Sequence, residues 1–143
     1  GWERLRNVQR IAWWIELFIY VAIASALCLG GFGILNGMLA TVRARTREIG
    51  LKKAMGAEDR DILLEFLMEA LYLSVGSVLI GIVLSWGLVL AISALLHTAP
   101  PLDLFLISTV LSVLFSLVLG GGAGAYPSIS ASRMEVVTAI RYE

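Results

Sequence analysis

Three long stretches without a formal charge constrain this chain more than any other feature. They cover residues 17–42, 70–96 and 104–132, and contain 26, 27 and 29 residues. A helix of roughly 20 apolar residues is long enough to cross the hydrocarbon core of a bilayer. With 59% apolar and 15% charged residues, the composition also lies far from that of a soluble domain. The sequence therefore predicts an all-α membrane protein with three transmembrane helices.

The charged residues lie mainly outside these stretches and divide the chain into segments. Gly56 suits the end of one helix, and the acidic residues that follow it suit the start of the next, as early as Glu58 or Asp59. We expect a helix leading into the membrane at 1–16, membrane helices at 17–42, 62–96 and 104–126, a charged segment at 43–61, an outer loop at 97–103 and a tail at 127–143.

Lysine and arginine counts predict the orientation of the chain. The charged segment 43–61 holds six of these residues and the tail 127–143 holds two, whereas the loop 97–103 holds none. The three arginines within residues 1–16 are a mild exception. The positive-inside rule therefore predicts a cytoplasmic charged segment and C-terminus, with the N-terminus outside.

Several side chains are expected near or within the first span. Trp13 and Trp14 are predicted at the outer interface, where indole rings prefer to lie. Glu16 is either a carboxylate on a substrate path or an interfacial residue, and its position near the boundary favours the second interpretation. Cys28 is the only cysteine, so no internal disulfide is possible, and we expect a small buried side chain.

Two pairs of glycines predict helix packing. Gly33 and Gly37 form one pair and Gly120 and Gly124 the other, both with the small-xxx-small spacing of membrane helix contacts. The run at 120–125 (GGGAGA) lowers helix stability unless close backbone approach or bending compensates. We therefore expect both pairs to lie where helices touch.

Few residues are suited to catalysis or metal binding. Glu65 and Glu69 lie four residues apart and could bind a metal ion, but no histidine accompanies them, and ion pairs with the basic segment are favoured. The only histidine, His97, has no cysteine or carboxylate at ligand spacing. No nucleophile elbow or phosphate-binding loop is found, and a net charge of zero gives no attraction for nucleic acid. We expect a non-catalytic chain without bound cofactor, metal or nucleic acid.

The charged segment 43–61 is the clearest candidate for function, because its nineteen residues hold ten of the 22 formal charges. Residues 45–55 are predicted to form a short amphipathic helix, in which Glu48 and Lys52 can pair. Gly50 would allow close approach of a partner. Composition leaves two interpretations open: a helix lying on anionic lipid, and a helix gripping a cytoplasmic protein.

The residue order of this segment resembles one protein family. Residues 46–57 (TREIGLKKAMGA) look like the hallmark of MacB/FtsX-type ABC transporter permeases, at the same place between two spans. Residues 31–36 (GFGILN), 61–70 (DILLEFLMEA) and 127–143 (PSISASRMEVVTAIRYE) are similar to other parts of that family. In the last of these, Glu135 and Val136 stand where the family has Asp-Pro. Because valine, unlike proline, allows a helix to continue, the tail is expected to run on as a helix.

The resemblance implies a permease subunit of the bacterial inner membrane that acts as a dimer, with a second copy or a paralogue. Two cytoplasmic ATPase subunits would bind ATP and Mg²⁺ and drive mechanotransmission, in which motion crosses the membrane without a substrate channel. Residues 1–16 would be the end of a stalk, and a further span with an extracytoplasmic domain would come from a separate chain or a missing part. The residues implied to contact the ATPase, as a coupling helix, are Arg45, Thr46, Arg47, Glu48, Ile49, Gly50, Lys52, Lys53, Ala54, Met55 and Gly56.

Two other functions stay open at this point. One is an FtsX-like scaffold that activates an extracytoplasmic cell-wall hydrolase and transports nothing. The other is a small membrane anchor whose basic segment meets only lipid. No residue in the sequence indicates a substrate.

Overall fold

Five helices make up residues 1–141, the part of the chain that the computed structural model describes. They are α1 (Trp2–Ala44), α2 (Thr46–Ala54), α3 (Asp59–Leu95), α4 (Leu102–Ser132) and α5 (Val136–Arg141). No strand occurs among these residues, and α1, α3 and α4 are each long and apolar enough to cross a membrane. The predicted all-α fold with three membrane helices is confirmed.

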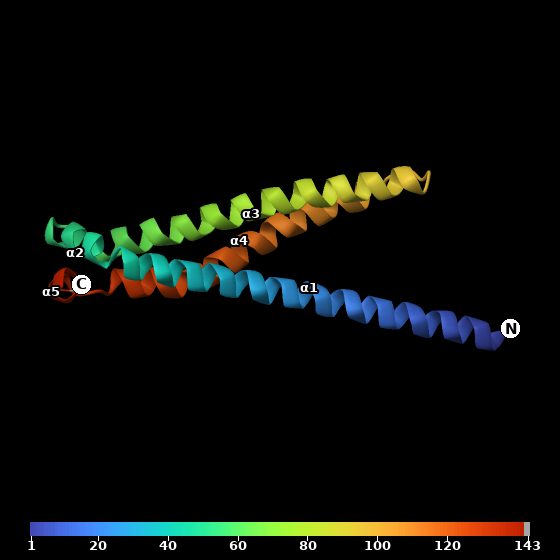
Figure 1. Cartoon of the computed structure of the whole chain (residues 1–143), viewed down its shortest axis with the longest axis horizontal. Coiled ribbons are helices and arrows are strands. Elements are labelled where there is room, and N and C mark those ends of the chain that lie inside the picture. The colour runs from blue at the N-terminus through green and yellow to red at the C-terminus, as the bar shows by residue number, and fades with distance from the viewer. Residues whose placement is uncertain (142–143) are drawn as a thin grey trace.

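The three long helices are arranged as a hairpin and a diverging arm. α3 and α4 are antiparallel and pack against each other, joined by the loop of residues 96–101. The second half of α1 packs against α4, whereas the first half of α1 diverges from the hairpin toward the N-terminus (Figure 1). α2 and α5 pack together at the end of the molecule opposite both the N-terminus and the loop between α3 and α4. We call this end the α2 end.

α1 is one continuous helix that includes both the expected stalk helix and the first membrane helix. Its 43 residues correspond to a length of about 64 Å, against about 30 Å for a hydrocarbon core. The rings of Trp13 and Trp14 are exposed and lie edge to face, with centroids 5.0 Å apart. The expectation of a buried Cys28 is wrong: its side chain is exposed, like every residue of α1 from Trp2 to Gly30.

A kink at Arg45 separates α1 from α2. The backbone there has φ −103° and ψ 17°, outside the helical geometry on either side. The buried hydroxyl of Thr46 donates to the carbonyl oxygens of Val42 and Arg43, at 3.0 and 2.9 Å. Bonds of this kind from threonine to the preceding turn bend helices, and α2 accordingly leaves the axis of α1.

Gly56 ends α2 in the left-handed region, with φ +104°, which glycine adopts without steric cost. Its N–H donates to the carbonyl oxygen of Lys53 at 3.1 Å, and the N–H of Ala57 donates to that of Lys52 at 3.0 Å. These two bonds are the pattern of a Schellman motif. The prediction that Gly56 ends the helix is confirmed.

α3 begins at Asp59, and acidic residues fill its first turn as predicted. The N–H of Glu58 donates to the carboxylate of Asp61 at 3.0 Å, which satisfies one of the free donors at the helix start. Negative side chains are also favoured there by the helix dipole.

Gly120 and Gly124 lie where α4 touches α3. A Cβ at Gly124 would collide with the Cβ of Ala70, and one at Gly120 would collide with the hydroxyl of Ser74. The contact also carries a hydrogen bond, because Ser116 donates to the carbonyl oxygen of Ser74 at 2.8 Å. Close packing through small residues and interhelical hydrogen bonds is what holds helices together in lipid.

The second glycine pair, also expected at a helix contact, does not lie at a contact between the described helices. Gly33 and Gly37 are exposed, and apart from the adjacent backbone of α1 and the two neighbouring residues, no atom of the described residues lies within 4 Å of a Cβ placed on either. α1 approaches α4 instead at Gly30 and Gly31, where a Cβ would lie 3.9 and 3.3 Å from the side chain of Leu119.

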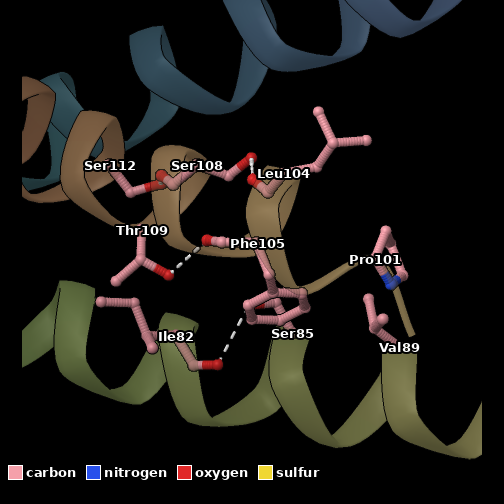
Figure 2. A pocket seen from close by; sticks show the side chains of 9 residues that line it. All are labelled: Ile82, Ser85, Val89, Pro101, Leu104, Phe105, Ser108, Thr109 and Ser112. Carbon is pink, nitrogen blue, oxygen red and sulfur yellow. Dashed lines mark hydrogen bonds between the residues drawn. The ribbon is translucent and has the colours of Figure 1, made fainter. Parts of the chain in front are cut away.

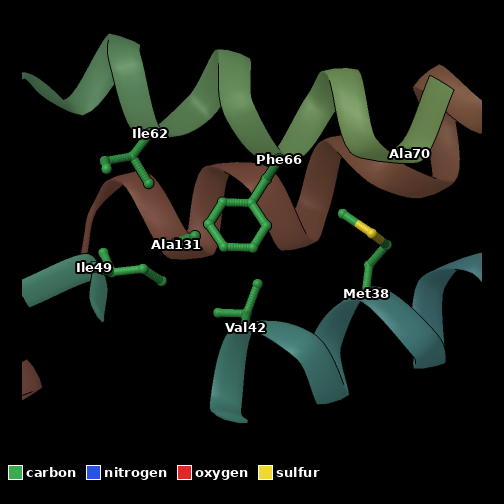
Figure 3. Close-up of a cluster of buried hydrophobic side chains, with 7 residues drawn as sticks. All are labelled: Met38, Val42, Ile49, Ile62, Phe66, Ala70 and Ala131. Atoms are coloured by element: carbon green, nitrogen blue, oxygen red, sulfur yellow. The ribbon is translucent and has the colours of Figure 1, made fainter. Parts of the chain in front are cut away.

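The buried core lies at the α2 end and not in the middle of the helices. Figure 3 shows Phe66 pointing from α3 toward Val42 of α1, with Met38 and Ile49 on either side. Most large apolar side chains along the spans are exposed, which suits helices surrounded by lipid. The core cluster consists of Met38, Val42, Ile49, Ile62, Phe66, Ala70 and Ala131.

The tail differs from its prediction. α4 passes through the buried Pro127 and ends at Ser132, and a break at 133–135 separates it from α5. The expectation that the tail runs on as a helix is therefore wrong. Valine at position 136 permits a helix, but contacts from α2, described below, hold the chain in a turn.

Candidate functional site

Arg45, at the kink between α1 and α2, is the centre of an ion-pair network. Its guanidinium lies 3.0 Å from the carboxylate of Glu48, 3.2 Å from that of Glu65 and 3.3 Å from that of Glu69. The same group lies 5.4 Å from the centre of the Phe66 ring. The hydrogen bond with Glu48 raises the pKa of Arg45 above its ordinary value.

Lys52 extends this network on the same side of α2. Its Nζ lies 2.7 Å from Oε1 of Glu65, the carboxylate that also binds Arg45. The prediction that Glu65 and Glu69 pair with the basic segment is confirmed. The pairs are half-exposed, and each such pair contributes only about 0 to 1 kcal/mol, so their main effect is to orient α2 against α3.

Lys53 points the other way, into the molecule, and its side chain is only 7% exposed. Its ammonium group donates to the carbonyl oxygens of Ser132 and Met134, the latter at 2.8 Å. It also lies 2.8 Å from the carboxylate of Asp59. Two carbonyl oxygens and one carboxylate of the same chain therefore lie within bonding distance of an ammonium group that carries three N–H donors.

Gly50 is buried against α5. A Cβ at this position would lie 2.8 Å from the Cβ of Ala139 and 3.3 Å from Cγ1 of Ile140. Ala139 itself is completely buried. The glycine therefore allows close approach, as predicted for this residue, but the group that approaches belongs to the same chain.

The opposite face of α2 is open. Arg47, Leu51 and Met55 are spaced four residues apart and so share one side of the helix. Met55 is 81% exposed and Leu51 is 47% exposed. This exposed face of α2 consists of Arg47, Glu48, Leu51, Ala54, Met55 and Gly56.

The eleven residues predicted to contact a partner therefore fall into two groups. Five lie on the exposed face: Arg47, Glu48, Ala54, Met55 and Gly56. The other six turn toward the rest of the chain: Arg45, Thr46, Ile49, Gly50, Lys52 and Lys53.

Sequence reasoning left out two residues at this end. Leu51 was not among the predicted contacts, although its spacing of four from Arg47 and Met55 on a short helix would have identified it. Ala139 had no comparable signal, because nothing in the sequence shows that α5 folds back onto Gly50.

A second candidate is a pocket of about 290 Å³ between α3 and α4, near the loop that joins them (Figure 2). It is lined by Ile82, Ser85, Val89, Pro101, Leu104, Phe105, Ser108, Thr109 and Ser112. Each of the four hydroxyl groups donates to a carbonyl oxygen of its own helix. No titratable side chain is present in the lining, so the pocket offers no general acid or base that could activate these hydroxyl groups.

Comparison with known proteins identifies related permeases. The family model described as FtsX-like permease C-terminal matches residues 20–136. The macrolide export ATP-binding/permease protein MacB of Bdellovibrio bacteriovorus is 45% identical over 129 residues, which cover 90% of this chain and 20% of MacB. The pyoverdine export ATP-binding/permease protein PvdT of Pseudomonas syringae pv. tomato is 42% identical over 130 residues, covering 90% and 19%. The uncharacterized ABC transporter permease YvrN of Bacillus subtilis is 40% identical over 151 residues, covering 96% and 35%.

The chain thus spans about a fifth of the length of MacB and PvdT, and about a third of YvrN. The region matched by the family model includes α2, α3, α4 and more than half of α1. Three apolar helices and these bacterial relatives mark a protein of the bacterial inner membrane. The chain belongs to the FtsX-like permease C-terminal family, within the ABC transporter permeases of the MacB/FtsX type.

Proposed function

We propose that the α2 end faces the cytoplasm and that the exposed face of α2 docks onto an ABC ATPase. The observation that carries this proposal is that α2 is held by the rest of the chain on every side except one. That side presents Leu51 and Met55 together with the exposed Arg47, one turn before Leu51. Methionine and arginine are enriched at protein interfaces, where apolar contacts lie inside a polar rim. The excess of lysine and arginine in 43–61 supports the orientation.

In this proposal the chain transmits motion and catalyses nothing. ATP and Mg²⁺ would bind to the ATPase, and displacement of α2 would pass into the membrane helices. Among the described residues the buried polar side chains are hydroxyls of serine and threonine, which gives little support for a hydrophilic channel. α1 runs unbroken from Trp2 to the kink at Arg45 and would serve as a lever.

Export or extraction of a substrate is the process that this motion would drive. MacB and PvdT are both named as export proteins, which favours transport over the alternative of a signalling scaffold. The proposal includes a second permease copy, for which the exposed Gly33 and Gly37 offer a packing surface. Co-purification of two differently tagged copies tests that part of the proposal.

The docking surface is tested by the double variant Leu51→Asp/Met55→Asp. Two carboxylates placed in an apolar contact must lose water without a partner, so ATPase binding is expected to fall about tenfold or more. The measurement is the amount of ATPase that co-purifies with the tagged chain from its own membrane.

Leu96→Asp is the matched control, because Leu96 is also exposed, at 66%, but lies at the other end of the molecule. It is expected to leave the co-purified ATPase unchanged. Equal amounts of ATPase with the double variant and with the wild-type chain would show that the exposed face of α2 is not the docking surface.

A further inference from the structure

Lys53 occupies an unusual position for a residue of a partner-binding segment. A lysine ammonium is among the groups that are rarely buried unless paired. Here the side chain is nearly enclosed, and its contacts are with the end of α4 and the start of α3. Lys53 is thus the point where α2, α3 and α4 meet.

The end of α4 explains what this ammonium does. The last carbonyl oxygens of a helix have no partner within it and carry a partial negative charge. Lys53 donates to the carbonyl oxygens of Ser132 and Met134, on both sides of Arg133, where α4 ends. These bonds hold the turn at 133–135, which the sequence itself does not impose.

α5 is fixed to α2 by the neighbouring contact at Gly50. A helix of six residues is too short to be stable alone in water, so its structure depends on what it packs against. Ala139 and Ile140 fill the space left by the missing side chain of Gly50. α2 therefore supports both the turn after α4 and the helix that follows it.

The polar contacts of α2 with α3 and with α4 differ in how far they are exposed to water. Toward α3 the ion pairs of Arg45 and Lys52 are half-exposed, so water and salt weaken them. The buried Ile49 adds an apolar contact with α3 in the core cluster. Toward the end of α4 the contact is an almost buried ammonium group that donates to two carbonyl oxygens. Breaking a buried charged contact is more costly than breaking an exposed one.

We infer that Lys53 and the Gly50–Ala139 contact lock α2 to the α4–α5 junction, so that displacement of α2 by an ATPase moves α4 as one body with it. Lys53 is then a positioning residue and not a partner contact. The inference rests on the proposed function for the source of the motion. The lock itself is a property of this chain and can be measured without the ATPase.

The first measurement is hydrogen–deuterium exchange of residues 133–141 in the full chain. Gly50→Ala and Lys53→Met are each expected to raise the exchange rate there by about tenfold. Ala139→Gly in the Gly50→Ala background makes room for the new methyl group and is expected to restore slow exchange. Lys52→Met is the matched control, because within residues 1–141 the ammonium of Lys52 pairs with Glu65 on α3 and not with the tail, and it is expected to leave this exchange unchanged.

The second measurement uses the complex with the co-purifying ATPase, in lipid nanodiscs with and without Mg-ATP. A spin label on the exposed Ser130, in the last turn of α4, is expected to change its mobility on ATP addition in the wild-type complex. Gly50→Ala and Lys53→Met should abolish this change while ATPase binding stays within about twofold of wild type. The double variant Gly50→Ala/Ala139→Gly should recover it.

Three results would overturn the inference, and they differ in what else they reject. Unchanged exchange of 133–141 in both variants would reject the lock alone. Loss of ATPase binding in a folded Lys53→Met chain would make Lys53 a partner contact. Absence of any ATP response in the wild-type complex would reject the proposed function, and with it the role given to the lock.

Discussion

Gly124→Leu is expected to insert into the membrane and to lose the packing of α4 against α3. Even a single carbon at this position would collide with the Cβ of Ala70, and a leucine adds three more. The obstacle is a Cβ held by the backbone of α3, not the end of a flexible side chain, so the two helices must separate. Overpacking of this kind costs about 3 kcal/mol, the upper end of the usual range.

Thermal unfolding in detergent, followed by tryptophan fluorescence, measures this effect, because Trp86 on α3 packs against Phe105 on α4. Gly122→Leu is the matched control, since Gly122 lies on the same helix with open space around it. Gly122→Leu should leave the unfolding temperature close to that of wild type. If both variants unfolded at the same temperature as the wild-type chain, the close contact at Gly124 would be wrong.

Phe66→Ala is expected to cause the second large loss, about 3 to 5 kcal/mol of unfolding free energy. The ring fills the centre of the core cluster between α1 and α3, and Arg45 lies over its face. Removing it leaves a cavity at the α2 end and takes away the aromatic partner of the guanidinium. Chemical denaturation in detergent, followed by circular dichroism, gives the free energy.

Phe115→Ala supplies the comparison, because Phe115 is 58% exposed on α4 and faces outward. Its loss is expected to change stability by no more than about 0.5 kcal/mol. Similar losses for the two variants would show that the core is not concentrated at the α2 end.

Much of the fold can be predicted from the sequence because membrane helices obey a simple constraint. Backbone groups in lipid must bond within their own helix, so long uncharged stretches predict helices directly. The start of α3 and the end of α2 follow from local chemistry, through the acidic residues after Glu58 and through Gly56. The pairing of Glu65 and Glu69 with the basic segment could be predicted because carboxylates near a membrane interface are stabilised by nearby basic side chains.

What the sequence does not reveal depends on contacts between distant residues. Lys53 and Gly50 belong to a segment whose composition is typical of contact with solvent or with a partner. In the structure both residues are covered by the tail of the chain. The turn after Ser132 has no proline to impose it and is held by Lys53 instead. Cys28 is exposed, and no local pattern indicates which part of α1 the other described helices cover.

The division of α2 into a locked side and an open side gives the predicted coupling residues separate roles. Variants of Gly50 or Lys53 probe how the chain holds α2, whereas variants of Leu51 or Met55 probe what α2 touches. A substitution on the locked side is expected to disturb the fold of the tail and to abolish transmission of motion, whereas one on the open side is expected to weaken ATPase binding. The two kinds of experiment therefore need to be read together.

The central claim is that the exposed face of α2 meets an ABC ATPase, and photo-cross-linking tests it most directly. A photoreactive amino acid replaces Met55 in one chain and Leu96 in another, and each chain is irradiated in its own membrane. The account predicts a covalent adduct with an ABC ATPase from position 55 and none from position 96. An ATPase adduct from position 96, or its absence at position 55 while the ATPase still co-purifies, would contradict the account.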